Sequence, residues 1–515
     1  MNPEYRSFAH ERAFAALVLF AGILGSGLLA AHLGQDAGWD LRNYHWYVPH
    51  ALIGGRLGFD ILPSFMGPTF HNPAIDLPFW FAVHLLGPEG ATIVLGAVQG
   101  LNILPLYLIA RRVLPALPTP AAALLALAGI AGAMNIGLLG ATAGDNLLSL
   151  FVLCAIAALL SGPRGLWLAG LVAGAGFGLK PVLAPFIVGL ALTVIACELF
   201  RAGGFLRVAL FALCGLAGTL LTGGWWMATL WVHFGNPLMP YFNDIFGSAY
   251  VPARTYSDPG FTIGLPWPRI QLPFLAGIVD HVAAEAVFTD LRLPAAYLGA
   301  IGLFLAAVFG RLRGPGLRLA LVTLLTLMVW SVVFAIYRYV LAFEMLGPLL
   351  IAAALMVWIG RRGPALVAGA LAVAVILAAT RPPETERVAF AADLTAVEVP
   401  AIEDPAHVVI LMAGLTPAAF LIPSFPADIR FLRFDGYWID PDQTEALYAR
   451  EIRRVLDDPA VRPLILFNPE ERERVVPALA TLRPGLALGP CRPVPHRFEH
   501  PGTNGGRFVL CDVEG

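Results

Sequence analysis

The sequence of 515 residues is 58% hydrophobic and only 13% charged, and its mean hydropathy is +0.74. Soluble domains carry about 25% charged residues, so this composition argues against an ordinary soluble protein and indicates a membrane protein with many spans. The formal net charge is −2. Binding to nucleic acid needs a surplus of basic residues, so we expect no nucleic-acid partner.

The apolar segments of the chain predict an all-α polytopic membrane protein with about 11 transmembrane helices. Several segments are shorter than the roughly 20 residues that cross a bilayer as a helix, so this number is approximate. In chain order the segments are Phe14–Ala31, Thr92–Ala110, Ala121–Leu139, Asn146–Leu160, Gly165–Leu179, Val182–Leu199, Val208–Val232, Pro294–Phe309, Leu319–Phe334, Leu341–Ile359 and Ala365–Ala379.

The arginines between these segments all fall on one side of the membrane if the spans alternate in direction. By the positive-inside rule that side is the cytoplasm, which places the N-terminus inside. We therefore expect a multi-pass protein of the cell's inner (plasma) membrane, surrounded by membrane lipids. The arginines are Arg111, Arg112, Arg164, Arg201, Arg207, Arg311, Arg313, Arg318, Arg361 and Arg362.

This topology predicts a transmembrane domain over residues 1–380, with outer loops at 34–90 and 234–292, and a soluble extracytoplasmic domain over residues 381–515. The second domain is charged and rich in proline, and we expect a small α/β fold for it. Its predicted strands are His407–Met412, Pro463–Phe467 and Arg507–Val513, and its predicted helices are Asp442–Leu456, with Asp442 as the N-cap, and Glu470–Leu482.

Two of the five cysteines lie outside the predicted spans. Cys491 and Cys511 can pair in an oxidising compartment, and we expect them within disulfide range, with Cα atoms roughly 4.4–6.8 Å apart. Cys154, Cys197 and Cys214 lie within spans and are expected to be packing residues.

The chain is organised around residues 38–47, Gly-Trp-Asp-Leu-Arg-Asn-Tyr-His-Trp-Tyr, directly after the first apolar segment. Asp40, Asn43, Tyr44 and Tyr47 are spaced so that one short α-helix would show a carboxylate, an amide and two phenols on one face. Tryptophan and tyrosine favour the membrane interface, which predicts an interfacial helix with its carboxylate at the water edge. An aromatic belt with one solvated aspartate is the alternative interpretation.

Burying a charged side chain at membrane depth costs free energy, so a charged residue found there indicates a function. Asp145, Lys180 and Arg338 all lie at outer ends of spans in the predicted topology, and Glu344 lies about a turn and a half deeper than Arg338. Lys180 is the only lysine of the chain. Lys180 and Arg338 are cations on the side that the positive-inside rule disfavours, and with Asp40 and Asp145 they predict a site. For each of them alone, a snorkelling side chain or a simple ion pair is the alternative.

The two outer loops provide candidate walls for such a site. The first contains His71, in Gly67–Pro73, and the second contains His233–Asn243, where asparagine and tyrosine alternate with aromatic residues. These residue types suit sugar hydroxyls and ring faces, but they equally suit an ordinary loop. The sequence contains no glycine-rich phosphate loop, CxxC pair or HExxH helix, so it gives no support to nucleotide or zinc chemistry.

The sequence resembles the GT-C glycosyltransferases, membrane enzymes that use polyprenyl-phosphate sugars. The resemblance rests on Asp40 in a first outer loop with interfacial helices, on the many spans and on the outer C-terminal domain. The stretch Gly235–Tyr241 and the Arg338–Tyr339 pair ahead of a late span also resemble prokaryotic members of that superfamily. The resemblance covers roughly residues 1–380 as architecture. The sequence departs from the family in two ways: Asp36 accompanies Asp40 in place of an adjacent Asp-Glu pair, and the WWDxG-type signature of oligosaccharyltransferases is absent.

The resemblance implies transfer of a sugar from a polyprenyl-phosphate donor to an acceptor hydroxyl on the extracytoplasmic side. The acceptor is a glycan, a lipid or a protein. Direct displacement inverts the anomeric centre, with a carboxylate as base and cations that stabilise the departing phosphate. The resemblance leaves open whether a divalent metal takes part in the reaction, and it implies no specific cofactor. The implied roles are general base for Asp40, acceptor or cation positioning for Asp145, donor phosphate binding for Lys180 and Arg338, and other substrate contacts for Asn43, Tyr44, His71 and Tyr339.

Two rival functions use the same residues. A transporter or flippase for a lipid-linked or anionic substrate would use the two cations as a binding site. A transporter needs access to its site from both faces of the membrane, whereas all candidate groups lie on the outer face. The sequence also shows no internal repeat of the kind common in transporters. A polymerase or ligase of surface polysaccharide shares the compartment and the lipid phosphate with the glycosyltransferase.

Overall fold

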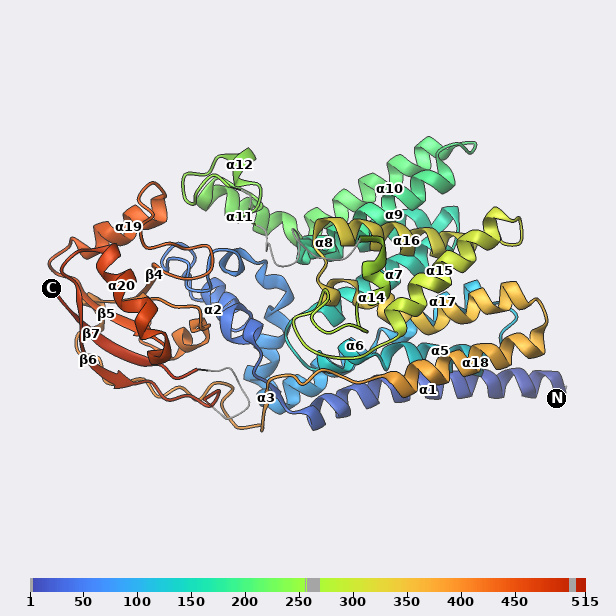
Figure 1. Cartoon of the computed structure of the whole chain (residues 1–515), viewed down its shortest axis with the longest axis horizontal. Helices are drawn as coiled ribbons and strands as arrows, with labels where there is room; N and C mark the ends of the chain where they lie inside the picture. The colour runs from blue at the N-terminus through green and yellow to red at the C-terminus, as the bar shows by residue number, and fades with distance from the viewer. Residues whose placement is uncertain (1–2, 255, 257–268, 500–505) are drawn as a thin grey trace. The chain divides into compact units, whose positions relative to one another are not determined.

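The computed structural model describes residues 3–254, 256, 269–499 and 506–515 (Figure 1). The chain forms two compact units. We call Met1–His32, Thr92–Gly224 and Ser257–Thr385 the helical unit, and Leu33–Ala91, Trp225–Tyr256 and Glu386–Gly515 the mixed unit. Residues 255 and 257–268 of the predicted outer loop lie outside the described residues. The predicted division into a transmembrane domain over residues 1–380 and a soluble extracytoplasmic domain over residues 381–515 stays a prediction.

The helical unit is built almost wholly of apolar helices, and among them α15, α17 and α18 run side by side (Figure 1). Its helices are α1 (Pro3–Leu33), α4 (Ile103–Val113), α5 (Thr119–Ile130), α6 (Ala133–Gly137), α7 (Asp145–Leu160), α8 (Leu166–Leu179), α9 (Ala184–Glu198), α10 (Gly204–Thr219), α14 (Leu272–Leu275), α15 (Arg292–Val308), α16 (Pro315–Val333), α17 (Leu341–Ile359) and α18 (Arg362–Ala379), and α3 (Leu77–Gly100) is shared with the mixed unit.

Seven stretches of the described chain are long and apolar enough to cross a membrane, and α5, α7 and α15 are shorter apolar helices. The prediction of a multi-pass membrane protein is confirmed, while the number of about 11 spans is not. The predicted span Ala121–Leu139 is wrong as a single helix, because α5 ends at Ile130 and α6 is a separate short helix. The side-chain amide of Asn135 donates to the Ile130 carbonyl and so satisfies that end of α5.

Glycines allow α8 to pack closely on α10. A Cβ atom at Gly170 or Gly174 would collide with the backbone carbonyl of Phe211 or Gly215, respectively. Small residues spaced four apart let helix backbones approach where no water-driven hydrophobic force acts between them. Within the next stretch of the chain, the π-helical turn Leu220–Gly224 separates α10 from α11 (Trp225–Phe234).

Three arginines that the sequence placed on one side of the membrane meet at a single carboxylate. Glu198, at the end of α9, is buried, and its Oε2 atom lies 2.8 Å from Nε of Arg207. Its Oε1 atom lies 2.6 Å from Nη2 of Arg318 and 3.8 Å from Nη1 of Arg201. The end of α9 and the beginnings of α10 and α16 therefore lie together, as the one-sided arginine pattern requires. That this side is the cytoplasm stays a prediction.

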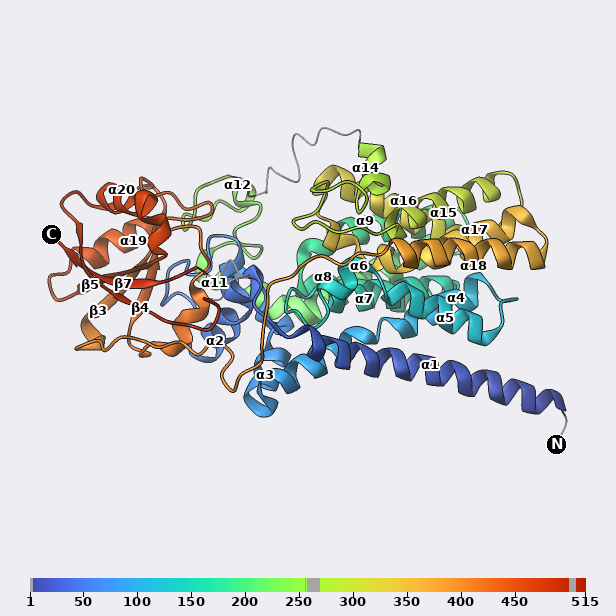
Figure 2. The ribbon, with the colours of Figure 1, turned by 60° about the horizontal axis from the view of Figure 1, so that its bottom comes forward.

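The mixed unit contains a five-stranded sheet of order β4-β3-β5-β7-β6 (Figure 2). Strands β3 (Val408–Met412), β4 (Arg430–Arg433) and β5 (Arg462–Phe467) are parallel, and β7 (Val509–Glu514) joins β5 and β6 (Ala487–Pro493) by antiparallel pairing. The three strands predicted from the sequence correspond to β3, β5 and β7, and the α/β fold is confirmed. Strands β4 and β6 were not predicted, because β4 is only four residues long and proline interrupts the apolar pattern of β6.

Helices α19 (Leu447–Leu456) and α20 (Arg472–Leu482) cover one face of this sheet (Figure 2). Alternate residues of the strands, among them Leu411 and Ile465, share a buried core with Tyr448 and Val475 of the two helices. The predicted start of α19 at Asp442 is wrong. Residues 440–443 form a turn closed by a 3.2 Å hydrogen bond from the Gln443 amide to the Asp440 carbonyl, so the helix begins later, at Leu447.

Segments from the N-terminal part of the chain complete the mixed unit. Strand β1 (Gln35–Asp36) pairs antiparallel with β2 (Arg387–Val388), and Ile61 forms a bridge with Leu432 of β4. The remaining helices of the unit are α2 (Tyr47–Ile53) and α12 (Asn243–Phe246), besides α11. Cys491 and Cys511 face each other across β6 and β7 and form a disulfide, which confirms the predicted pair. Their Cα atoms are 3.9 Å apart, closer than the roughly 4.4–6.8 Å that we expected.

A buried aspartate joins the N-terminal segment to β4, and its loss should destabilise the protein. Asp60 accepts hydrogen bonds from Tyr47 Oη (2.7 Å), from Arg56 Nε and Nη2 (2.7 and 2.8 Å), and from the Phe431 amide (2.9 Å). We expect Asp60→Asn to cost about 3–5 kcal/mol of stability, because it leaves the buried Arg56 guanidinium without its counter-charge. A thermal melt measures this. The control is Asp404→Asn, whose side chain is 69% exposed, and an equal melting temperature for both variants would contradict the prediction.

A buried histidine predicts a specific loss of stability in acid. His496 is 6% exposed and packs against the rings of Phe420 and Phe508, with centroids 5.1 and 5.5 Å away. Burial lowers the pKa of His496 to about 4. The unfolded chain therefore binds a proton near pH 6.5 that the folded chain takes up only near pH 4, so the folded state loses stability as the pH falls through this window.

The loss at His496 should reach about 3 kcal/mol at the acid end of the window. We expect His496→Phe to flatten the dependence of the melting temperature on pH between about 6.5 and 4, since the replacement keeps an aromatic ring and removes the titrating group. The matched control is His407→Phe, because His407 is exposed. Parallel pH profiles for the wild type and His496→Phe would refute the assignment.

Candidate active site

A pocket in the helical unit joins the start of α7, the turn after α8 and the turn before α17. Asp145 opens α7, and Arg338 and Tyr339 lie in the 3-10 turn Tyr337–Val340 that leads into α17. The pocket thus unites three of the site residues predicted from the sequence, although Arg338 and Asp145 are separated by 193 residues. The remaining lining residues are mostly apolar: Leu148, Ser149, Val152, Val182, Leu183, Phe186, Ala342 and Phe343.

Two carboxylates hold the guanidinium of Arg338 in this pocket. Its Nη1 atom donates to Asp145 Oδ2 at 3.3 Å, and its Nε atom lies 3.1 Å from Glu285 Oε2. The Asp145 side chain is 1% exposed and that of Glu285 is 50% exposed, so one partner is inside and the other faces outward. The planar guanidinium fork also lies 5.3 Å from the centre of the Tyr339 ring. Such a fork matches the geometry of a phosphate oxygen pair.

Lys180 approaches the same pocket from the end of α8. It is only 4% exposed, and its Nζ atom donates a 2.9 Å hydrogen bond to the Ala143 carbonyl, two residues before Asp145. Pro181 begins the next short turn, whose residues Val182 and Leu183 line the pocket. The structure therefore places the only lysine of the chain beside the loop that carries Asp145, although Lys180 itself is not among the lining residues.

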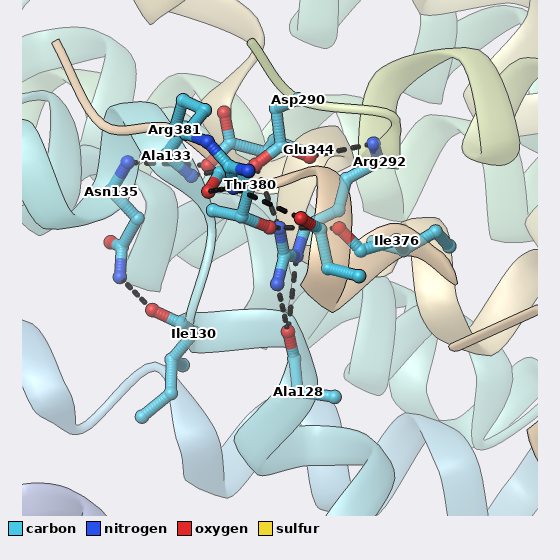
Figure 3. Close-up of polar contacts among 11 residues, drawn as sticks. Ala128, Ile130, Ala133, Asn135, Asp290, Arg292, Glu344, Ile376, Thr380 and Arg381 are labelled. Carbon is cyan, nitrogen blue, oxygen red and sulfur yellow. Dashed lines mark hydrogen bonds and ion pairs between the residues drawn. The ribbon is translucent and has the colours of Figure 1, made fainter. Parts of the chain in front are cut away.

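A second group of charged residues lies deeper in the helical unit and has a structural role (Figure 3). The carboxylate of Asp290 accepts from the Ala133 amide (2.6 Å) and pairs with Arg292 Nη1 (2.7 Å). Arg292 also donates to the Ala128 carbonyl and to Thr380 Oγ1, so it joins the ends of α5, α15 and α18. Glu344 accepts from the Asn135 amide at 3.2 Å. The Asn135 backbone amide thus satisfies one carboxylate oxygen of Glu344 inside α17.

The predicted helix through Asp40 is present, but it is not a regular α-helix. Trp39 and Asp40 are helical, Leu41–His45 form a π-helical turn, and α2 follows from Tyr47. A π turn closes from i to i+5, so it breaks the helical face expected from the spacing. Asp40 itself is half-buried. The turn is anchored by Arg42, which is fully buried, donates to the Ala37 carbonyl at 2.8 Å and pairs with Glu386 at 2.5 Å.

The predicted substrate contacts of the first outer loop lie in the mixed unit. Asn43 and Tyr44 are buried, with exposures of 0% and 3%, and the rings of Tyr44 and His71 meet edge to face at 4.7 Å. The structure therefore brings Tyr44 and His71 together. Both side-chain atoms of Asn43 are buried and have no hydrogen-bond partner among the described residues, which is typical of an amide that binds water or a ligand.

One polar pair in this region was not predicted. His45 Nδ1 lies 2.6 Å from Asp76 Oδ1, and both residues are buried, at 1% and 4% exposure. A carboxylate in this position fixes the orientation of the imidazole ring. No sequence signal distinguishes the pair, because the two residues are 31 positions apart and follow no motif. In the described part of the chain, no three His, Cys, Asp or Glu side chains gather as a metal site requires.

The structure leaves one prediction about the site open. Asp145, Lys180, Arg338 and Tyr339 belong to the helical unit, whereas Asp40, Asn43, Tyr44 and His71 belong to the mixed unit. The expected convergence of Asp40 with the first group stays a prediction.

No family model matches the chain, and no curated protein matches it in sequence. Two crystal structures of ArnT from Cupriavidus metallidurans match it in fold. The structure bound to undecaprenyl phosphate is 13% identical, with a TM-score of 0.50 over 98% of this chain and 97% of the ArnT chain. The apo structure is 14% identical, with a TM-score of 0.51 over 99% and 98% of the two chains. The chain therefore has the fold seen in these two ArnT structures.

Proposed function

We propose that the protein is a membrane glycosyltransferase that moves a sugar from a polyprenyl-phosphate donor to an acceptor hydroxyl on the extracytoplasmic side. The observation that carries the proposal is the likeness of fold over nearly the whole length to ArnT, which has been crystallised with undecaprenyl phosphate. The Arg338 pocket supports it, because a guanidinium oriented by a buried carboxylate is suited to a phosphate.

In this proposal the leaving phosphate is stabilised by Arg338 and Lys180. Negative charge grows on the bridging oxygen as the sugar leaves, and preorganised cations at low dielectric stabilise that charge by several kcal/mol. Asp145 is a positioning residue, since its 3.3 Å contact orients Arg338. Tyr339 contributes the ring beside the guanidinium.

Asp40 is proposed as the general base that takes the proton of the acceptor hydroxyl. The anchoring of its turn by Arg42 and Glu386 keeps the carboxylate in a defined place, which general-base catalysis requires. A single in-line displacement inverts the anomeric centre. Asn43, Tyr44 and His71 are proposed to contact the substrates, and the acceptor is a glycan, a lipid or a protein.

The test uses the purified full chain in lipid nanodiscs. Undecaprenyl-phosphate donors that carry different radiolabelled hexoses and pentoses are offered with extracts of envelope glycans and lipids, and the release of undecaprenyl phosphate is followed. We expect release with one donor class and a covalently labelled acceptor. Movement of intact donor across liposomes without any release would contradict the proposal and favour the transporter. Labelled chains that grow by many units would favour the polymerase.

A further inference from the structure

Two exposed aromatic rings of the mixed unit, one of them next to Asp40 in the chain, pack against a third ring that is buried. The indole of Trp39 stacks on Phe65, with centroids 5.9 Å apart and planes 8° apart, and Tyr437 meets both rings edge-on, at 6.1 Å from Trp39 and 5.2 Å from Phe65. Phe65 is 1% exposed, whereas Trp39 is 37% and Tyr437 is 48% exposed. We call the exposed pair the Trp39–Tyr437 platform.

The platform is held rigidly from beneath. The guanidinium of the fully buried Arg433 lies 4.2 Å from the Phe65 ring centre, on which Trp39 rests. Tyr437 lies in a tight turn closed by two reciprocal 3.1 Å hydrogen bonds between the backbones of Gly436 and Ile439. Gly436 has a φ of 157°, and a Cβ atom there would meet Phe65 at 2.6 Å, so glycine is what allows this turn to approach the ring. Rigid exposed rings are preorganised for binding, because little freedom is lost.

The exposed area of the platform limits the size of the ligand that it can bind. A buried aromatic side chain covers about 150–250 Å², so the exposed parts of the two rings offer roughly 200 Å². A stable protein partner needs about 800 Å² on each side, which is far more. Two polar groups lie near the rings in the sequence. Asp40 directly follows Trp39 and is half-buried, and the buried Asp435, two residues before Tyr437, holds Arg474, whose side chain is 43% exposed. A small ligand with one apolar face and a hydroxylated edge fits this combination.

We propose that the Trp39–Tyr437 platform binds a pyranose ring of the acceptor, so that the acceptor contains a glycan. The inference rests on the proposed function and narrows its acceptor from glycan, lipid or protein to a glycan. The C–H face of a pyranose carries partial positive charge and packs on the negative face of an aromatic ring, while its hydroxyls turn toward polar neighbours. Trp39 directly precedes Asp40, so a ring stacked here brings acceptor hydroxyls to the neighbourhood of the proposed base.

The test is a saturation-transfer NMR titration of the full chain in detergent with methyl glucopyranoside, methyl galactopyranoside and methyl mannopyranoside. We expect transfer to the ring C–H protons of at least one glycoside, and about tenfold weaker binding in Trp39→Ala and in Tyr437→Ala, which corresponds to about 1.4 kcal/mol. Trp39→Phe should keep most of the binding because it keeps a ring. The matched control is Trp231→Ala, since Trp231 is an exposed tryptophan of the same unit, at 54%, and its ring contacts Phe246.

The outcomes separate this inference from the proposed function, because the titration needs neither donor nor turnover. Absence of binding by the wild type, or equal losses in Trp39→Ala and Trp231→Ala, would overturn the platform. Quenching of Trp39 fluorescence by brominated lipids, judged against Trp39→Phe, would also overturn it and identify a lipid contact. The protein could bind sugar through the platform and yet release no undecaprenyl phosphate from any donor. That result would uphold the platform as a sugar site and refute the proposed glycosyltransferase activity.

Discussion

Replacement of Asp40 by asparagine is expected to lower turnover by about 10²–10⁴-fold while the dissociation constant for the lipid donor changes little. Asparagine has nearly the same shape as aspartate and cannot take a proton, so only the base is lost. The measurement is the rate of undecaprenyl-phosphate release under saturating donor, together with donor binding at equilibrium. The loss should appear in kcat, because a base acts on the acceptor hydroxyl in the transition state.

The matched control for Asp40 is Asp36→Asn, because Asp36 is the other acidic residue of the same stretch. Asp36 is buried, and its Oδ1 atom accepts from the Gly38 amide at 2.9 Å, which gives it a role in holding the loop. We expect Asp36→Asn to change stability more than turnover. Normal turnover in Asp40→Asn, or a large loss of kcat confined to Asp36→Asn, would overturn the assignment of the base.

Replacement of Arg338 by alanine is expected to weaken donor binding by about 10–100-fold, because charge-assisted hydrogen bonds contribute about 1.5–3 kcal/mol. Arg338→Lys should not restore the binding, since an ammonium is a point charge and cannot reproduce the planar fork. Lys180→Ala should also weaken the binding of the lipid donor. Binding of undecaprenyl phosphate in nanodiscs measures both effects, and Arg361→Ala, at an exposed arginine of the helical unit, is the control.

The single variant at Arg338 also leaves the buried carboxylate of Asp145 without its ion pair. A double variant, Arg338→Ala with Asp145→Asn, removes that unpaired charge. We expect the double variant to melt near the wild-type temperature and still to bind the donor poorly. Normal donor binding by the double variant would show that Arg338 serves only to neutralise Asp145, and the phosphate role would fall.

The sequence was sufficient for features that depend on local composition. An apolar stretch long enough to cross a bilayer is a property of neighbouring residues, so the multi-pass character was predicted. The number of spans was not confirmed, and the span Ala121–Leu139 is broken into two helices. Local composition also predicted strands β3 and β5, which are short apolar runs between turns. The disulfide was predicted because only one pair of cysteines lies outside the spans.

Local rules failed where distant contacts override them. The spacing of Asp40, Asn43 and Tyr44 predicted an α-helical face, yet the burial of Arg42 against Glu386, 344 residues away, accompanies a π-helical turn instead. The edge strand β6 carries little apolar signal of its own, because its residues are exposed or half-buried, and its pairing with β7 decides its structure.

By itself the sequence determined the class of protein, and it indicated candidate site residues because rare charged residues stand out against an apolar background. Only the tertiary structure decided which of these residues meet. It paired Arg338 with Asp145 and Glu285, joined His45 to Asp76, and assembled Trp39, Phe65 and Tyr437 into one surface. The physical reason is that each contact joins residues far apart in the chain, and its energy depends on burial and geometry that no local pattern contains.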